Sequence, residues 1–192
     1  QIVMRLGATA TVVDYRLAPE HPYPAAIEDC ITVYQALLEE VNPSSLVVAG
    51  DSAGGGAALA TVVALRDAGD PPPACLYLMS PWTDLTLSGE TYQTMRSVDP
   101  LVPPGGIDSH LRLMDDLVDG YRGDEDASHP GISPLFADLV GLPPMLVQVG
   151  GDELLLSDST MLAERAEAAG VEVDLDVADG MWHVWQFLSP WL

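Results

Sequence analysis

The chain has 192 residues, of which 48% are hydrophobic and 19% are charged, a composition typical of one folded domain and not of a disordered chain. Its 29 acidic and 7 basic residues, the latter all arginine, give a formal charge of −22. Nucleic acid and anionic membranes would be repelled by such a charge, so we expect neither as a partner.

No apolar run reaches the roughly 20 residues that a membrane-spanning helix needs, and no signal peptide is visible. We therefore predict no membrane span and a cytoplasmic location. Because the chain begins at Gln1 and not at a methionine, we expect the natural N-terminus to lie upstream. Cys30 and Cys75 are expected to be buried free thiols, with a disulfide between them as the alternative, and no cluster of cysteine and histidine predicts a metal site.

Apolar, β-rich runs alternate with helical patterns, which predicts an α/β fold with a mainly parallel sheet flanked by helices. The predicted strands cover residues 9–15, 46–49, 74–79, 143–149 and 171–177, and the predicted helices cover residues 25–40, 57–68 and 157–169. Ser157 or Asp158 is the expected N-cap of the last helix, and Gly170 its C-cap.

Residues 83–142 interrupt this alternation with a comparatively polar stretch that is too long for an ordinary connection. We predict that this stretch is a cap or lid inserted into a single domain of residues 1–192, lying over the carboxyl edge of the sheet. One helical pattern is visible within it, over residues 107–121.

Residues 50–54 read Gly-Asp-Ser-Ala-Gly, a G-x-S-x-G pattern between a predicted strand and a predicted helix. That context is typical of a nucleophile elbow, in which close-packed flanking glycines permit a strained turn. Ser52 is therefore the candidate nucleophile, and the backbone amide of Ala53, at the helix start, is a candidate oxyanion donor. The alternatives are a glycine-rich phosphate-binding turn and a plain strand–helix loop.

A serine nucleophile needs a base, and in this fold type the base follows it in the chain. Four histidines are present. His183 stands in the loop after the last predicted strand and is the expected base. His21 precedes Ser52, and His110 and His129 lie in the predicted insertion, where a surface or packing role is expected.

The base in turn needs a carboxylate that orients it, and this acid is expected at the end of the preceding strand. Asp152 stands there and is the predicted acid, with Glu153 adjacent to it and Asp158 close by. Asp158 has an alternative use as a helix cap, and Glu153 is expected to face solvent.

Several segments together resemble the hormone-sensitive-lipase-like branch of the α/β-hydrolases, which includes bacterial carboxylesterases. The resemblance is carried by residues 14–22 (Asp-Tyr-Arg-Leu-Ala-Pro-Glu-His-Pro), 24–26 (Pro-Ala-Ala), 50–55 (Gly-Asp-Ser-Ala-Gly-Gly), 80–85 (Ser-Pro-Trp-Thr-Asp-Leu), 151–155 (Gly-Asp-Glu-Leu-Leu) and 181–184 (Met-Trp-His-Val). It implies hydrolysis of short- to medium-chain acyl esters with no cofactor and no metal. It also implies a substrate pocket near Ala53, Trp82 and Val184.

Members of that family carry an upstream His-Gly-Gly-Gly segment, whose glycine amides supply most of the oxyanion hole, and a final helix after the histidine. This sequence shows neither, so it resembles an internal part of a longer enzyme. In the family, the strand that ends at the glycine segment separates the strands that match residues 12–15 and 46–49. We therefore expect a gap, closed by direct pairing of these strands, by a second copy of the chain or by a segment outside the 192 residues.

Two other functions stay open at this point. The missing glycine segment favours a catalytically inactive, small-molecule-binding module of the same fold, whereas the presence of His183 favours an enzyme. A third interpretation keeps the enzyme but makes the substrate an amide or a formamide. The gap in the sheet also makes a homo-oligomer an expected state of this chain.

Overall fold

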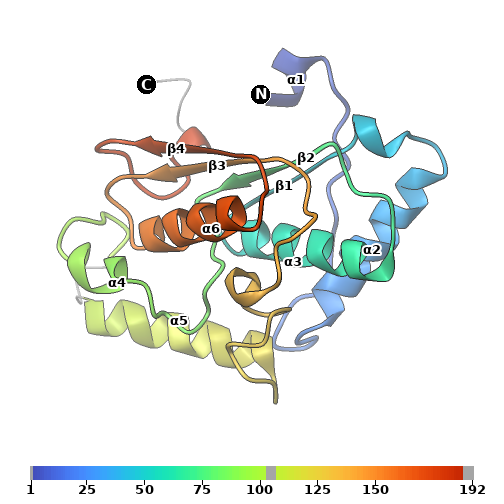
Figure 1. The fold of residues 1–192 in the computed structure, drawn as a ribbon. Coiled ribbons are helices and arrows are strands. Elements are labelled where there is room, and N and C mark those ends of the chain that lie inside the picture. Colours follow the sequence, from blue (N-terminus) through green and yellow to red (C-terminus); the bar gives the residue numbers. More distant parts are fainter. Residues whose placement is uncertain (1, 103–106, 188–192) are drawn as a thin grey trace.

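The computed structural model describes residues 2–102 and 107–187, which are built around one four-stranded parallel sheet (Figure 1). The strands are β1 (Val47–Asp51), β2 (Cys75–Met79), β3 (Met145–Gly150) and β4 (Val173–Ala178), paired in that order. The helices are α1 (Ile2–Leu6), α2 (Ala25–Leu38), α3 (Ala53–Ala68), α4 (Thr91–Thr94), α5 (Ile107–Arg122) and α6 (Leu156–Ala168), with 3₁₀ turns η1 (Pro43–Ser45) and η2 (Pro134–Phe136). Within these residues, no helix is both long and apolar enough to cross a membrane.

The main core lies between the sheet and two helices, α3 and α6, which cover one face of it (Figure 1). Leu76 and Leu78 of β2 and Val147 of β3 are completely buried. They belong to one apolar cluster with Leu59 of α3 and Leu162 of α6. Burial of each such side chain contributes about 1.5–3 kcal/mol, so this cluster fixes the sheet against the two helices. The α/β fold predicted from the sequence is confirmed.

The predicted helices all form, but the ends of α6 differ from the prediction. Its N-cap residue is Leu155, and no side chain caps the helix. Ser157 and Asp158 lie inside the first turn and bond instead to the segment that follows β2. At the other end the C-cap is Ala169, and Gly170 follows it with a φ of 81°.

The chain between β2 and β3 contains α4, α5 and η2 and forms a second apolar cluster. Figure 1 shows α5 on the side of α3 and α6 that faces away from the sheet. Tyr92 of α4 and Met114 and Val118 of α5 pack in this cluster with Trp82, which follows β2, and with Leu155. The predicted helix at 107–121 is therefore present, and the role of residues 83–142 as a lid stays a prediction.

The strand predicted at residues 9–15 does not form. This segment is irregular, has no strand partner among the described residues, and exposes 88% of Val12. A groove of about 480 Å³ separates it from β1, whose Val47 is 56% exposed. Since a strand is held by ladder hydrogen bonds to a neighbour, the distance across the groove explains why none forms here. Direct pairing is therefore wrong, and closure by a second copy or by a further segment stays a prediction.

The end of the irregular segment is attached to α2 by an ion pair. The Arg16 guanidinium donates to both carboxylate oxygens of Asp29 at 2.9 Å, and the Arg16 backbone amide donates to the same carboxylate at 2.9 Å. A bidentate pair fixes orientation as well as distance. It therefore holds the start of the following loop, residues 17–19, in place beside the site described below.

Both cysteines are free thiols, as predicted, but each is half-buried and not fully buried. Burial raises the pKa of the Cys30 thiol. A raised pKa favours the protonated form of the thiol near neutral pH.

Candidate active site

Ser52 occupies the sharp turn between β1 and α3, with a φ of 53° and a ψ of −126°. A non-glycine residue rarely adopts such a conformation unless the surrounding structure enforces it. Here the Ser52 amide donates to the Met79 carbonyl of β2 at 2.9 Å, and the Ser52 carbonyl accepts from the amides of Gly55 at 3.0 Å and Trp82 at 2.9 Å. The turn is thus held by the neighbouring strand, by its own helix and by the loop after β2.

The two glycines of the G-x-S-x-G pattern differ in what they permit. A Cβ atom on Gly50 would lie 2.2 Å from the Gly54 carbonyl oxygen, so a glycine is required there. A Cβ atom on Gly54 would meet nothing within 4 Å. Close packing therefore explains Gly50, as predicted, but not Gly54, which borders the groove beside β1.

His183 lies in the loop after β4, and its Nε2 is 2.9 Å from Ser52 Oγ. That loop is fixed to the loop after β3, because the Asp152 amide donates to the Met181 carbonyl at 2.9 Å. A Cβ atom on Gly150 would lie 2.3 Å from the same carbonyl oxygen, so the two loops touch where a side chain cannot fit. The structure therefore brings together the predicted nucleophile and the predicted base.

The carboxylate that approaches the other imidazole nitrogen belongs to Glu153 and not to the predicted Asp152. Glu153 Oε1 is 3.5 Å from His183 Nδ1, and the Glu153 side chain is completely buried. Its second oxygen, Oε2, accepts from Ser80 Oγ at 2.9 Å and from the Gly150 amide at 3.2 Å.

Asp152 is half-buried, and its carboxylate forms no hydrogen bond or ion pair with any residue that the structure describes. The reason is the turn at residues 151–154, which follows β3 and directs the side chain of Glu153, not that of Asp152, under the imidazole. The prediction that Glu153 faces solvent is likewise wrong. Sequence position alone could not separate two adjacent acids.

The Asp158 side chain accepts hydrogen bonds from the loop after β2. Its Oδ2 accepts from the amides of Thr83 and Asp84, both at 2.8 Å, and its Oδ1 accepts from the Tyr92 hydroxyl at 3.1 Å. Burial raises the pKa of Asp158 to about 7, although these hydrogen bonds oppose the rise. Asp158 therefore fixes the backbone next to Trp82 instead of capping α6.

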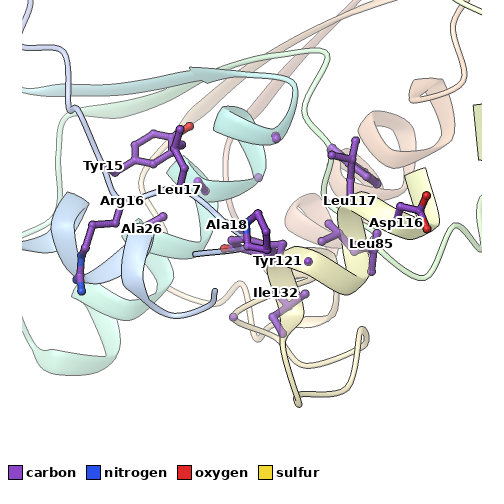
Figure 2. A pocket seen from close by; sticks show the side chains of 18 residues that line it. Tyr15, Arg16, Leu17, Ala18, Ala26, Leu85, Asp116, Leu117, Tyr121 and Ile132 are labelled. Atoms are coloured by element: carbon purple, nitrogen blue, oxygen red, sulfur yellow. The ribbon is translucent and has the colours of Figure 1, made fainter. Parts of the chain in front are cut away.

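A cavity of about 430 Å³ lies next to Ala53, the residue after Ser52, and is lined mostly by apolar groups. Its lining residues come from the segment at residues 15–18, from α5 and from the loop after β2, among other places, as Figure 2 shows. Ala53 and Trp82 line it, as the resemblance implies, whereas Val184 is not among the lining residues. Its lining also includes Tyr15, Leu17, Leu85, Leu117, Tyr121 and Ile132.

The other histidines have other surroundings. His21 is exposed in the loop before α2, and the ring of His129 packs against Tyr23 with 5.4 Å between the centroids. His110 belongs to α5, and its side chain is outside the described part of the structure. In residues 2–102 and 107–187, no group of three or more histidine, cysteine or acidic side chains is arranged to hold a metal ion.

A serine on a strained strand–helix turn of a parallel sheet, next to a histidine from the loop after the last strand, defines a class of fold and site: the α/β-hydrolases. The sequence model of the family described as alpha/beta hydrolase fold matches residues 1–187. The chain therefore belongs to the α/β-hydrolase family.

Individual relatives narrow the family to one branch. An acetyl-hydrolase of Streptomyces hygroscopicus is 41% identical over 185 residues, which are 96% of this chain and 60% of the relative. A solved esterase/lipase from an uncultured bacterium superposes with a TM-score of 0.92 at 43% identity, covering 100% of this chain and 62% of that one. A solved esterase from the bacterial hormone-sensitive lipase family superposes with a TM-score of 0.86 at 46% identity. The match covers 93% of this chain and 58% of that one. The chain is a hormone-sensitive-lipase-like α/β-hydrolase that spans about 60% of the length of these relatives.

Proposed function

We propose that this chain is the catalytic part of a serine carboxylesterase. The observation that carries the proposal is the 2.9 Å distance between His183 Nε2 and Ser52 Oγ. A hydroxyl in hydrogen-bonding contact with an imidazole, which is in turn approached by a buried carboxylate, is the arrangement that activates a serine as a nucleophile. The esterase and acetyl-hydrolase names of the relatives support the same reaction class.

In the proposed mechanism, Ser52 Oγ attacks the acyl carbon while His183 Nε2 takes the hydroxyl proton. Glu153 orients the imidazole and stabilises its cationic form. The tetrahedral intermediate expels the alcohol oxygen, which takes the proton back from His183 and leaves an acyl-enzyme. Water then repeats the sequence: it attacks the acyl carbon, gives a proton to His183, and the carboxylic acid leaves as Ser52 is re-protonated.

The developing oxyanion needs hydrogen-bond donors. Ala53 is the first residue of α3, so its amide is one of those with no carbonyl partner inside the helix. The family's His-Gly-Gly-Gly segment does not occur in the 192 residues. Loss of one oxyanion donor costs roughly 10²–10³ in rate, so we expect slow turnover by these residues alone.

The cavity beside Ala53 favours an uncharged acyl chain. Its walls are mostly apolar and its volume is about 430 Å³. Short- to medium-chain acyl groups are therefore the substrates that we propose, with no metal and no cofactor. The cytoplasmic location and the homo-oligomer expected from the sequence stay predictions.

The test is hydrolysis of p-nitrophenyl butyrate by the 192-residue chain. We expect turnover that disappears in Ser52→Ala and persists in Ser159→Ala, a control that removes a buried hydroxyl without a hydrogen-bond partner. Equal background rates in all three proteins, together with saturable binding of a small acid, would support the inactive binding module instead. Faster release of p-nitroaniline from the matching butyranilide than of nitrophenol would favour the amide hydrolase.

A further inference from the structure

Ser80 is the residue directly after β2, and it is completely buried. Its φ is 45°, a conformation that costs a non-glycine residue free energy. Its amide donates to the Gln148 carbonyl at 2.7 Å, which continues the ladder between β2 and β3. The backbone position is therefore set by the sheet, and glycine would adopt it without strain.

The Ser80 hydroxyl connects the two other loops of the site. It donates to Glu153 Oε2 at 2.9 Å and accepts from the Val184 amide at 3.1 Å. Val184 directly follows His183 and also has a positive φ, of 52°. One hydroxyl thus bonds to the acid that faces the imidazole and to the backbone next to that imidazole.

We propose that Ser80 is a positioning residue for the base, an inference that rests on the proposed function. With Oε2 held by Ser80 and by Gly150, the remaining oxygen of Glu153 is directed at His183 Nδ1. The hydrogen bond from the Val184 amide fixes the position of the His183 loop relative to the same carboxylate. Among the described residues, the Ser80 hydroxyl hydrogen-bonds to Glu153 and to the Val184 amide, so its effect on the base passes through Glu153 and the His183 loop.

Removal of the hydroxyl leaves two buried groups with fewer partners. Glu153 Oε2 keeps only the longer bond, from the Gly150 amide at 3.2 Å, and the Val184 amide loses its acceptor. A hydrogen bond to a charged group is among the stronger ones in proteins. The carboxylate and the imidazole would then sample more arrangements, and fewer of them would present Nε2 to Ser52.

The test uses Ser80→Gly, which removes the hydroxyl and also the backbone strain, beside Ser80→Ala and the control Ser159→Ala. At a temperature at which all three variants are folded, we expect kcat for p-nitrophenyl butyrate to fall roughly 10- to 100-fold in both Ser80 variants and to stay at the wild-type value in the control, with KM within about threefold in all three. Wild-type kcat in Ser80→Gly would overturn the proposal, and Ser80→Gly keeps it testable if Ser80→Ala does not fold.

Two readouts separate positioning from a general structural effect. In a Glu153→Gln background, we expect the additional loss from Ser80→Gly to shrink to less than about threefold, because coupled residues are not additive. An undiminished loss would contradict a role through Glu153.

The second readout is the Nδ1 proton resonance of His183 in protein labelled with nitrogen-15 histidine. It should be the same in wild type and Ser159→Ala and shifted in Ser80→Gly, and an unchanged resonance would overturn the proposal. Absence of Ser52-dependent turnover in every form would reject the esterase function, while the resonance would still decide the role of Ser80.

Discussion

Glu153 and His183 meet beyond the carboxyl ends of β3 and β4, with 3.5 Å between Oε1 and Nδ1. The Glu153 side chain is completely buried and that of His183 is 17% exposed. Water therefore has little access to this contact, and an interaction between a carboxylate and an imidazole is stronger where water is excluded. Ser52 Oγ lies 2.9 Å from the opposite nitrogen, so the imidazole lies between a hydroxyl and a buried carboxylate oxygen that has no hydrogen-bond partner among the described residues.

The two adjacent acids should behave differently when neutralised. Glu153→Gln is expected to lower kcat for p-nitrophenyl butyrate by about 10³–10⁴-fold, because an amide in this position favours the wrong imidazole tautomer. Asp152→Asn should change kcat less than about threefold, since only its backbone amide is used in the site. Steady-state kinetics of both variants decide which of the two carboxylates acts on His183. A larger loss of kcat in Asp152→Asn than in Glu153→Gln would show that Asp152, the acid predicted from the sequence, has this role.

The comparison of Asp152 and Glu153 shows what sequence reasoning can reach. The closeness of Ser52 and His183 was predictable because each follows a predicted strand, and parallel strands bring such segments to one edge of the sheet. The choice between neighbouring carboxylates depends on the path of one tight turn, which is set by contacts with the 179–184 loop. Such contacts join residues that are distant in sequence, so no local pattern encodes them.

The same limit explains the segment at residues 9–15. Its β-branched residues favour a strand, but a strand also needs a neighbour with which to exchange hydrogen bonds. The buried strands β2 and β3 have neighbours on both sides and form as predicted. The 9–15 segment faces a groove instead, so propensity alone does not produce a strand.

The elbow glycines offer a matched pair for stability. Gly50→Ala should lower the free energy of unfolding by about 2–4 kcal/mol, because its Cβ atom would lie 2.2 Å from a backbone carbonyl that cannot move without breaking the turn. Gly54→Ala should leave stability unchanged or raise it by up to about 1 kcal/mol, since its surroundings are open and alanine favours the helix. Urea denaturation measures both, and equal effects would contradict the geometry of the turn.

Asp158 gives the protein a specific dependence of stability on pH. Burial raises its pKa to about 7, with Asp84 adding to the rise while the Thr83 and Asp84 amides and the Tyr92 hydroxyl oppose it. In the unfolded chain the carboxyl titrates near its ordinary value of about 3.9. Between about pH 4 and pH 7 the folded state therefore binds more protons than the unfolded one, so stability falls as the pH rises through this range.

Asp158→Asn keeps an acceptor for the two amides and removes the titration. Between pH 5 and pH 8 we expect wild type to lose about 1–3 kcal/mol of unfolding free energy relative to Asp158→Asn. Urea unfolding of both proteins at the two pH values provides the measurement. If the difference in unfolding free energy between wild type and Asp158→Asn were the same at pH 5 and pH 8, the Asp158 carboxyl would titrate alike in the folded and unfolded states.

Helix α5 offers a matched pair for acyl-chain selectivity. Leu117 and Leu113 are each 54% exposed, and Leu117 lines the cavity whereas Leu113 does not. Leu117→Trp should narrow the cavity. It should therefore lower kcat/KM for p-nitrophenyl octanoate by about tenfold more than it lowers kcat/KM for p-nitrophenyl acetate. A factor of this size is within the range that the displacement of one or two methylene groups produces. Leu113→Trp should leave the ratio of the two substrates unchanged, and a similar shift in both variants would place the acyl chain elsewhere.

The position of β1 in the sheet makes the site less resistant to heat than the fold as a whole. Among the described residues β1 is paired on one side only, with β2, whereas β3 is paired on both sides. A strand with one neighbour opens locally at a lower free energy than the interior of the sheet, and β1 is the strand that leads into Ser52. We therefore expect amide hydrogens of Val47–Asp51 to exchange faster than those of Met145–Gly150, and heat to abolish hydrolysis several degrees below the temperature at which the main core unfolds.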